Sequence, residues 1–184
     1  MDVLPAILCL LALHAVLGAV DTFVFHEWLE RLPARPSAAS ELALHSLRSL
    51  FFVVIFYGLA WYQWHGAFGW LMVALSLIEY AVTIDDSIVE DRTRRLSPWE
   101  RTNHMLLALN TGLYTGLLAL HVATRWGHEP TAIVPIRHLP LLAGVLTVAA
   151  IGVAVWAVRD GVAALRLRSA ERRSRPGQGV SGRV

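Results

Sequence analysis

Lysine is absent from this 184-residue chain, and cysteine occurs once, as Cys9. All 16 basic residues are therefore arginine. A single cysteine excludes an intramolecular disulfide and a metal site built from several thiolates. The chain also lacks a glycine-rich nucleotide loop, a nucleophile triad and a nucleic-acid-binding motif. We therefore expect neither nucleotide chemistry nor a nucleic-acid partner.

Long apolar runs are abundant, since hydrophobic residues make up 55% of the chain. A helix needs about 20 apolar residues to cross a bilayer core of about 30 Å. Five segments satisfy this requirement: 3–26, 43–63, 67–90, 102–124 and 138–158. No basic residue precedes the first segment, which favours a membrane helix over a cleaved signal peptide. The sequence predicts an all-α integral membrane protein with five transmembrane helices.

The arginines are distributed unevenly among the connections, and this predicts the orientation of the chain. Cytoplasmic loops carry an excess of basic residues. The first and third connections and the C-terminal segment are rich in arginine, whereas the second has none and the fourth has only Arg125 and Arg137. We predict an external N-terminus and a cytoplasmic C-terminus in a bacterial inner (plasma) membrane. Residues 1–168 would form the membrane domain, and residues 169–184 a basic, disordered cytoplasmic tail.

An internal similarity divides the membrane domain into two hairpins. When the chain is shifted by 64 residues, the stretch 21–32 overlies "DSIVEDRTRRL" and the residues before it. The matched residues, with a gap before the later ones, are Asp21 with Asp85, Glu41 with Glu100, and His45 with His104. This pattern predicts a duplication, with repeat 1 at about 3–63 and repeat 2 at about 67–126. Spans 1–4 would form a pseudo-twofold four-helix bundle, with an extra helix at about 138–168. Chance similarity between two amphiphilic hairpins is the alternative.

Helical periodicity predicts which side chains face the bundle interior. In span 1, small residues and a histidine share one face, where small side chains allow close helix packing. This stripe is Ala15, Gly18, Ala19, Thr22 and His26. The corresponding stripe in span 3 is Glu79, Val82, Thr83, Asp86 and Glu90. Four acids lie off these stripes and are expected to meet arginine or water: Asp21, Glu27, Asp85 and Asp91.

Glu41/His45 and Glu100/His104 each place a carboxylate and an imidazole four residues apart, on one side of a helix. Such a pair can bind one metal ion. The predicted metal ligands are Glu41, His45, Glu100, His104, His26, Glu90 and Glu79, with Asp86 as a proton relay. So many ligands predict two divalent ions. Imidazole with carboxylate suits iron, the first choice, or manganese or zinc.

This layout resembles ferritin-like di-iron carboxylate bundles, in which facing helices supply glutamate and Glu-x-x-His ligands. The resemblance implies a di-iron centre. The present chain departs from that pattern because its Glu–His spacing is one residue longer. It also has His26 where a carboxylate is expected. The likeness covers a few positions only.

Three functions follow from these residues. The first is a di-metal oxidoreductase that acts on an apolar, lipid-like or quinone-like substrate, with zinc-assisted hydrolysis as a variant. The second is a cation or metal transporter that uses the acids of span 3. The third is a b-type haem subunit with His45 and His104 as axial ligands. Association with itself or with a membrane complex is compatible with each.

Two structural alternatives use the same residues without a metal. Arg48 and Arg101 would neutralise the acids in an ion-pair network. Glu100 would only cap a helix that begins at Ser97-Pro98.

Overall fold

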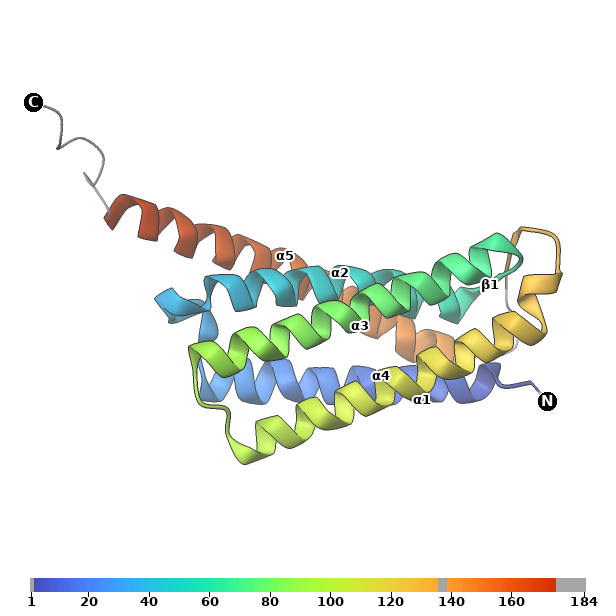
Figure 1. The fold of residues 1–184 in the computed structure, drawn as a ribbon, viewed down its shortest axis with the longest axis horizontal. Helices are drawn as coiled ribbons and strands as arrows, with labels where there is room; N and C mark the ends of the chain where they lie inside the picture. Colours follow the sequence, from blue (N-terminus) through green and yellow to red (C-terminus); the bar gives the residue numbers. More distant parts are fainter. Residues whose placement is uncertain (1, 136–138, 175–184) are drawn as a thin grey trace, which may run out of the picture.

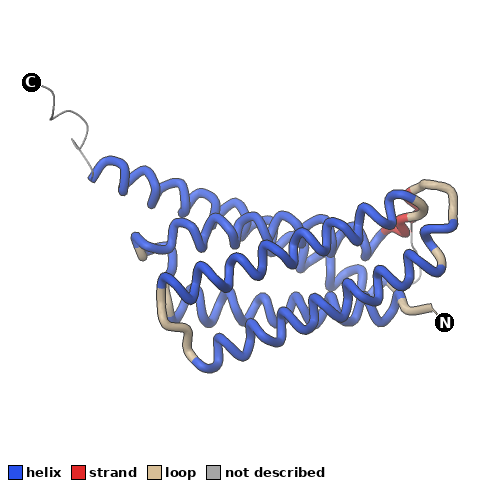
Figure 2. Tube along the Cα trace, viewed as in Figure 1, coloured by secondary structure: helices blue, strands red, loops and turns tan. Residues whose placement is uncertain are grey.

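Five long helices form the molecule in the computed structural model, which describes residues 2–135 and 139–174 (Figures 1 and 2). They are α1 (Leu4–Val20), α2 (Ala39–Trp61), α3 (Ala67–Thr93), α4 (Pro98–Thr124) and α5 (Pro140–Ser174). α1 continues without a break into η1 (Asp21–Leu29), a π-helix. The short helices are η2 (Leu32–Ala34), η3 (Pro36–Ala38) and η4 (Trp126–His128).

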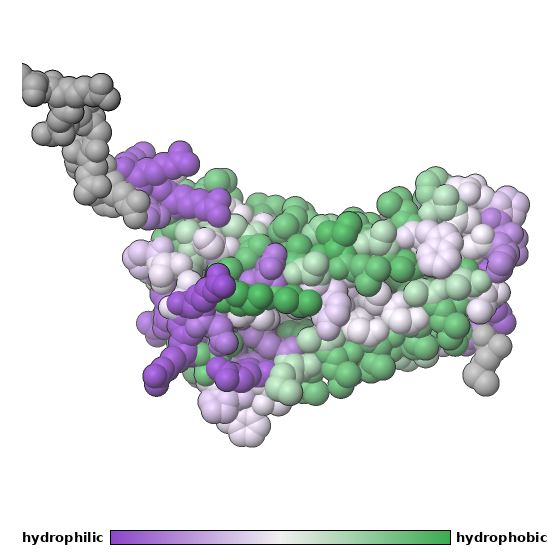
Figure 3. Space-filling view, viewed as in Figure 1, coloured by the Kyte–Doolittle hydropathy of each residue, from purple (hydrophilic) through white to green (hydrophobic). Residues whose placement is uncertain are grey.

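All five helices are long and apolar enough to cross a membrane, as judged by length and composition. The candidate spans are Leu4–Leu29, Pro36–Trp61, Ala67–Thr93, Pro98–His128 and Pro140–Arg173. Apolar side chains cover the middle of the molecule, and hydrophilic ones gather toward its two ends (Figure 3). The number of spans confirms the prediction from the sequence, and the bilayer is the environment that this surface fits.

The C-terminal helix is longer than predicted. α5 runs to Ser174, so residues 169–174 are helical and not part of a disordered tail. Residues 175–184 and the predicted outer-loop residue Arg137 lie outside the described residues.

The helices pack as neighbours around a common interior. α1 packs against α4, α4 against α3, and α3 against α2. α5 lies along α2 over much of its length and also contacts α1. The fifth helix is thus part of the core: Leu146 is fully buried, and Asp160 is 2% exposed. One half of the interior is apolar, with Ile7, Leu11 and Leu118 at its centre.

The end of the bundle near the N-terminus is closed by a short antiparallel pair of strands, β1 (Tyr62–Trp64) and β2 (Ile133–Pro135). Gly66 follows β1 with φ +57°, and a Cβ at this position would lie 2.4 Å from Thr131 Oγ1. Only glycine fits this turn without strain. The other half of the interior is polar and contains the candidate site.

The π-helix η1 has a direct effect on that site. A π-helix forms i→i+5 hydrogen bonds and has wider turns than an α-helix. The Glu30 N–H donates to Phe25 O at 2.8 Å in this pattern. Asp21 and His26, which are five residues apart, consequently lie on the same side of the segment, and both are buried.

Candidate functional site

Ionisable side chains from every long helix meet in the polar half of the interior. They come from η1, from the first half of α2, from the first turns of α4, from the middle and end of α3, and from the middle of α5. None of these side chains is more than 13% exposed. We call the following residues the buried polar cluster: Asp21, His26, Glu41, His45, Arg48, Glu79, Asp86, Glu90, Arg94, Glu100, His104 and Asp160.

Two overlapping groups of potential metal ligands lie within this cluster. Among the described residues, Asp21, His26 and His104 form one group, and His26, Glu41 and Glu90 form the other. Within each group, one ligand atom per residue lies within 4.8 Å of the others. Zinc bonds nitrogen and oxygen at about 2.0–2.2 Å in tetrahedral sites, so ligand atoms of one ion lie about 3.3–3.6 Å apart. Each group would therefore have to contract to hold an ion.

His104 connects the two groups. Its Nε2 lies 2.9 Å from Asp21 Oδ1, and its Nδ1 lies 3.1 Å from Glu90 Oε2. His26 Nε2 lies 3.5 Å from Glu90 Oε1 and 3.7 Å from Asp21 Oδ2. Two carboxylates thus alternate with two imidazoles, and η1, α3 and α4 each contribute to this arrangement.

Arg94, immediately after α3, lies among the acids of the cluster. Its Nη2 lies 2.7 Å from Glu100, 3.0 Å from Glu41 and 3.5 Å from Glu90. Burial lowers the pKa of Arg94, but the Glu100 and Glu41 carboxylates raise it further, so its pKa lies above the ordinary value. Arg94 is therefore a permanent cation that holds three predicted ligands together.

The predicted ion-pair partner Arg101 does not reach the cluster, which corrects that part of the alternative. Arg101 is 61% exposed and lies 3.4 Å from the exposed Asp91.

The helix-cap interpretation of Glu100 accounts for its backbone N–H but not for its side chain. The Glu100 N–H donates to Ser97 Oγ at 3.2 Å, but the Glu100 carboxylate turns inward to Arg94.

Arg48 acts as the predicted alternative expects, because it lies among the deeper acids. Its Nη1 donates to Asp86 Oδ2 at 2.7 Å, and its Nε lies 3.8 Å from Glu79 Oε1. Thr83 Oγ1 donates to Glu79 at 2.6 Å. Glu79 and Asp86 are thus in the cluster but outside the two ligand groups. The burial of Glu79, Thr83, Asp86 and Glu90 confirms the predicted inward face of α3.

His45 has a partner that the sequence did not indicate. Its Nδ1 lies 2.9 Å from Asp160 Oδ2, and its ring centroid lies 4.6 Å from that of His26. Asp160 belongs to α5 and follows the predicted end of span 5 at residue 158. An isolated Asp-Arg pair at a helix end gives no signal of a buried role, so Asp160 could be found only from the packing of α5 on α2.

The four acids predicted to lie off the facing stripes differ in outcome. Glu27 pairs with Arg159, Asp91 with Arg101, and Asp85 is exposed, as expected. Asp21 is different, because it is 2% exposed and lies beside His104. Asp21 lies seven residues after the buried His14 and continues the buried face of α1, whereas the predicted stripe lies on the neighbouring face.

The cluster carries an excess of negative charge. Seven of its members are carboxylates, each no more than 2% exposed. Arg48 and Arg94 are the arginines in the cluster, while Arg159 is 35% exposed and also pairs with Glu27. Buried charges in proteins are generally paired or bound to metals. The two arginines leave five carboxylates to be balanced by protons, by protonated histidines or by a bound cation.

Three carboxylate oxygens in the cluster lack a hydrogen-bond partner: Glu79 Oε2, Asp86 Oδ1 and Glu100 Oε2. By contrast, His26 Nε2, His104 Nδ1 and Glu90 Oε1 take part in ion-pair contacts of 3.1–3.5 Å. Buried polar atoms without a partner are uncommon, and each requires an explanation. A bound cation would supply a partner to such oxygens.

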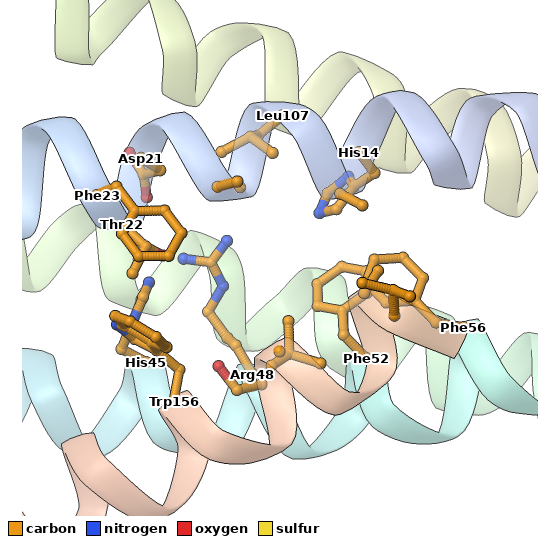
Figure 4. A pocket seen from close by; sticks show the side chains of 18 residues that line it. His14, Asp21, Thr22, Phe23, His45, Arg48, Phe52, Phe56, Leu107 and Trp156 are labelled. Atoms are coloured by element: carbon orange, nitrogen blue, oxygen red, sulfur yellow. The ribbon is translucent and has the colours of Figure 1, made fainter. Parts of the chain in front are cut away.

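A mainly apolar cavity of about 290 Å³ adjoins the cluster (Figure 4). Asp21, His45 and Arg48 lie toward one end of it, and His14 with Phe52 toward the other. The stripe predicted to pack closely in span 1 lines this cavity: nothing lies within 4 Å of a Cβ built at Gly18. The small side chains of α1 thus leave space where close helix contact was expected.

Comparison of the chain with protein families, with curated proteins and with solved structures finds no match. Its function is therefore argued from the geometry of this site.

Proposed function

We propose that the protein is a membrane-embedded di-metal oxidoreductase with an apolar, lipid-like substrate. One observation carries the proposal: histidine and carboxylate atoms from η1, α2, α3 and α4 converge in two overlapping groups, each within 4.8 Å. The excess of buried carboxylates over buried arginines supports it, because two divalent ions would balance most of that charge.

The two ligand groups suggest a division of roles. Asp21 and His104 would serve one ion, Glu41 the other, and His26 and Glu90 lie near both. Glu100 and His45 border the two groups, whereas Glu79 is a deeper acid held by Arg48. Asp86 lies on α3 between Glu79 and Glu90, and its unbonded Oδ1 suits the proposed proton relay.

Iron is the preferred metal because imidazole and carboxylate ligands suit it, although they also suit manganese and zinc. An iron pair supplies one-electron redox chemistry with dioxygen or a peroxide as the oxidant. The chain's own residues would hold the ions, exclude bulk water and move protons at Asp86. The adjoining apolar cavity would orient a substrate that enters from the bilayer.

Helix packing supports the proposed duplication and orientation. α1 packs on α4 as α2 packs on α3, and these two contacts are equivalent in a pseudo-twofold arrangement of two hairpins. α5 adds a further partner to α2. The arginine-rich end, which holds the cluster, would face the cytoplasm of a bacterial inner membrane.

The other functions receive less support. Haem ligation by His45 and His104 is disfavoured, because Nδ1 of His45 and both ring nitrogens of His104 lie beside carboxylates. A transport path requires acids that continue to the far end. There the described buried polar residues, such as Asn110, Thr111 and His121, include no acid. The ion-pair network is the strongest competitor, and it predicts that purified protein contains no metal.

Elemental analysis of the purified full-length protein tests the proposal. We expect about two ions per chain in the wild type, and clearly less metal in Glu90→Gln and His104→Gln. Asp91→Asn is the matched control, because Asp91 is the next residue but is 63% exposed. Visible absorption under oxidising and reducing conditions would identify iron. Metal-free wild type, or equal metal content in all four proteins, would favour the ion-pair network instead.

A further inference from the structure

The cavity beside the cluster contains one buried hydrogen-bond donor without a partner. Arg48 and Trp156 both line the cavity (Figure 4). Arg48 is paired with Asp86 and Glu79, whereas the buried Trp156 Nε1 has no hydrogen-bond partner. Most of the remaining wall is aliphatic or aromatic, as at Leu107 and Val153. A buried donor without a partner is costly, so an acceptor is expected at this place.

The charge around the cavity restricts the kind of acceptor. Arg48 is already paired with Asp86 at 2.7 Å, and the neighbouring cluster holds an excess of carboxylates. A second anion would be repelled by these groups, and it would lose hydration on entry. A neutral oxygen acceptor avoids both penalties, and a carbonyl oxygen is the simplest group of this kind in membrane-soluble molecules.

The shape of the cavity suits a slender apolar body. It extends along α1 from His14 to Asp21, a rise of about 10 Å for seven helical residues. Small residues line it on both α1 and α5, and nothing lies within 4 Å of a Cβ built at Gly18 or Gly152. These two helices are in contact elsewhere, so the gap between their small residues provides a lateral route from the bilayer.

We propose that this cavity binds one membrane-soluble molecule whose neutral carbonyl oxygen accepts a hydrogen bond from Trp156 Nε1, with its apolar body extending toward His14. A fatty acyl ester and a quinone both carry such a carbonyl group. The inference rests on the proposed function only in treating this molecule as the substrate. Binding itself depends on the cavity and requires no metal.

Photo-crosslinking of the full-length protein in phosphatidylcholine vesicles tests this proposal. The probe is a fatty acid methyl ester with a diazirine near its terminal methyl group, and the reference probe is an alkane of equal length with the same diazirine. We expect the ester to label peptides of α1 and α5 around Gly18 and Gly152 about fivefold more strongly than the alkane does. That ratio corresponds to about 1 kcal/mol, the net value of one hydrogen bond.

Two variants separate the donor from the space. Trp156→Phe keeps an aromatic ring but removes the N–H, so it should weaken the preference for the ester and leave alkane labelling unchanged. Gly152→Leu should fill the cavity and reduce labelling by both probes. Gly144→Leu is its matched control, because this glycine of α5 is equally open but does not line the cavity.

Competition identifies the source of the carbonyl. The bound probe is challenged with excess unlabelled ester or with a short-chain alkyl benzoquinone. Stronger displacement by the ester would indicate an acyl lipid, and stronger displacement by the benzoquinone would indicate a quinone. Equal labelling by ester and alkane in the wild type, or an unchanged preference in Trp156→Phe, would overturn the proposal. Labelling is measured with and without bound metal, so a metal-free protein that still selects the ester would refute the di-metal function but not this inference.

Discussion

Single side chains decide how the histidines of the cluster are oriented, and His45 shows this most clearly. With Nδ1 donating to Asp160, the free lone pair of the ring is on Nε2, on the other side of the imidazole. Histidine ligands of metals commonly donate their second nitrogen to a carboxylate, which fixes the tautomer and the orientation of the ring. Asp160 is placed to do this for His45 from a different helix.

Replacing Asp160 by asparagine should weaken metal binding without removing a ligand. Loss of such a carboxylate partner typically lowers metal affinity about 10–100-fold. Titration of the metal-free protein with Fe(II) would measure the change. Asp85→Asn, at an exposed position of α3, is the control and should bind like the wild type. Unchanged affinity in Asp160→Asn would mean that His45 is not part of the metal site.

At the scale of elements, the contact between α2 and α5 determines whether Asp160 reaches His45. The helices approach closely: Ser46 Oγ donates to Ala157 O at 2.7 Å, and a Cβ at Gly161 would lie 3.0 Å from Ser46 Oγ. The distance leaves little room for any side chain at residue 161. Glycine at this place lets the two helices meet at the depth of the cluster.

We therefore expect Gly161→Leu to separate α2 from α5 and to destabilise the protein. Overpacking a well-packed contact typically costs about 1–3 kcal/mol. Thermal unfolding in detergent, followed by circular dichroism, would show a lower midpoint than for Gly144→Leu, where the same side chain enters open space. Equal unfolding midpoints for the two variants would show that α2 and α5 can move apart without loss of stability.

At the scale of the whole molecule, the two ends differ in charge. Among the described residues, the end that holds the cluster carries Arg31 and Arg35 on either side of η2, the arginines of the α3–α4 connection and those of the last turns of α5. The opposite end carries Arg125, and hydrophilic side chains gather at both ends (Figure 3). Positive residues favour the cytoplasmic side. This difference is the basis of the proposed orientation, which can be measured.

Single-cysteine labelling in intact bacterial cells would test the orientation. In a Cys9→Ser background, a membrane-impermeant maleimide should label Glu129→Cys, which lies at the arginine-poor end. It should label Ser169→Cys, in the exposed last part of α5, only after the cells are broken. Labelling of Ser169→Cys alone in intact cells would reverse the predicted topology.

The sequence by itself determined the features that depend on local chemistry. Apolar length specified five helices because a bilayer core requires about 20 apolar residues per crossing. Periodicity of 3.6 residues placed Glu79, Asp86 and Glu90 on the buried face of α3, and Glu41 and Glu100 in the interior. These properties are set within one helix, so the order of residues was sufficient to predict them.

Only the tertiary structure decided which groups meet. Asp21 and His26 face the same interior because η1 winds as a π-helix after Asp21, and no composition rule distinguishes that winding from an α-helix. Arg94 rather than Arg101 enters the cluster, Asp160 arrives from α5, and the small residues of α1 border a cavity. Each of these outcomes depends on how one helix is rotated against another, because a side chain's partner across an interface is fixed by packing and not by its neighbours in the chain.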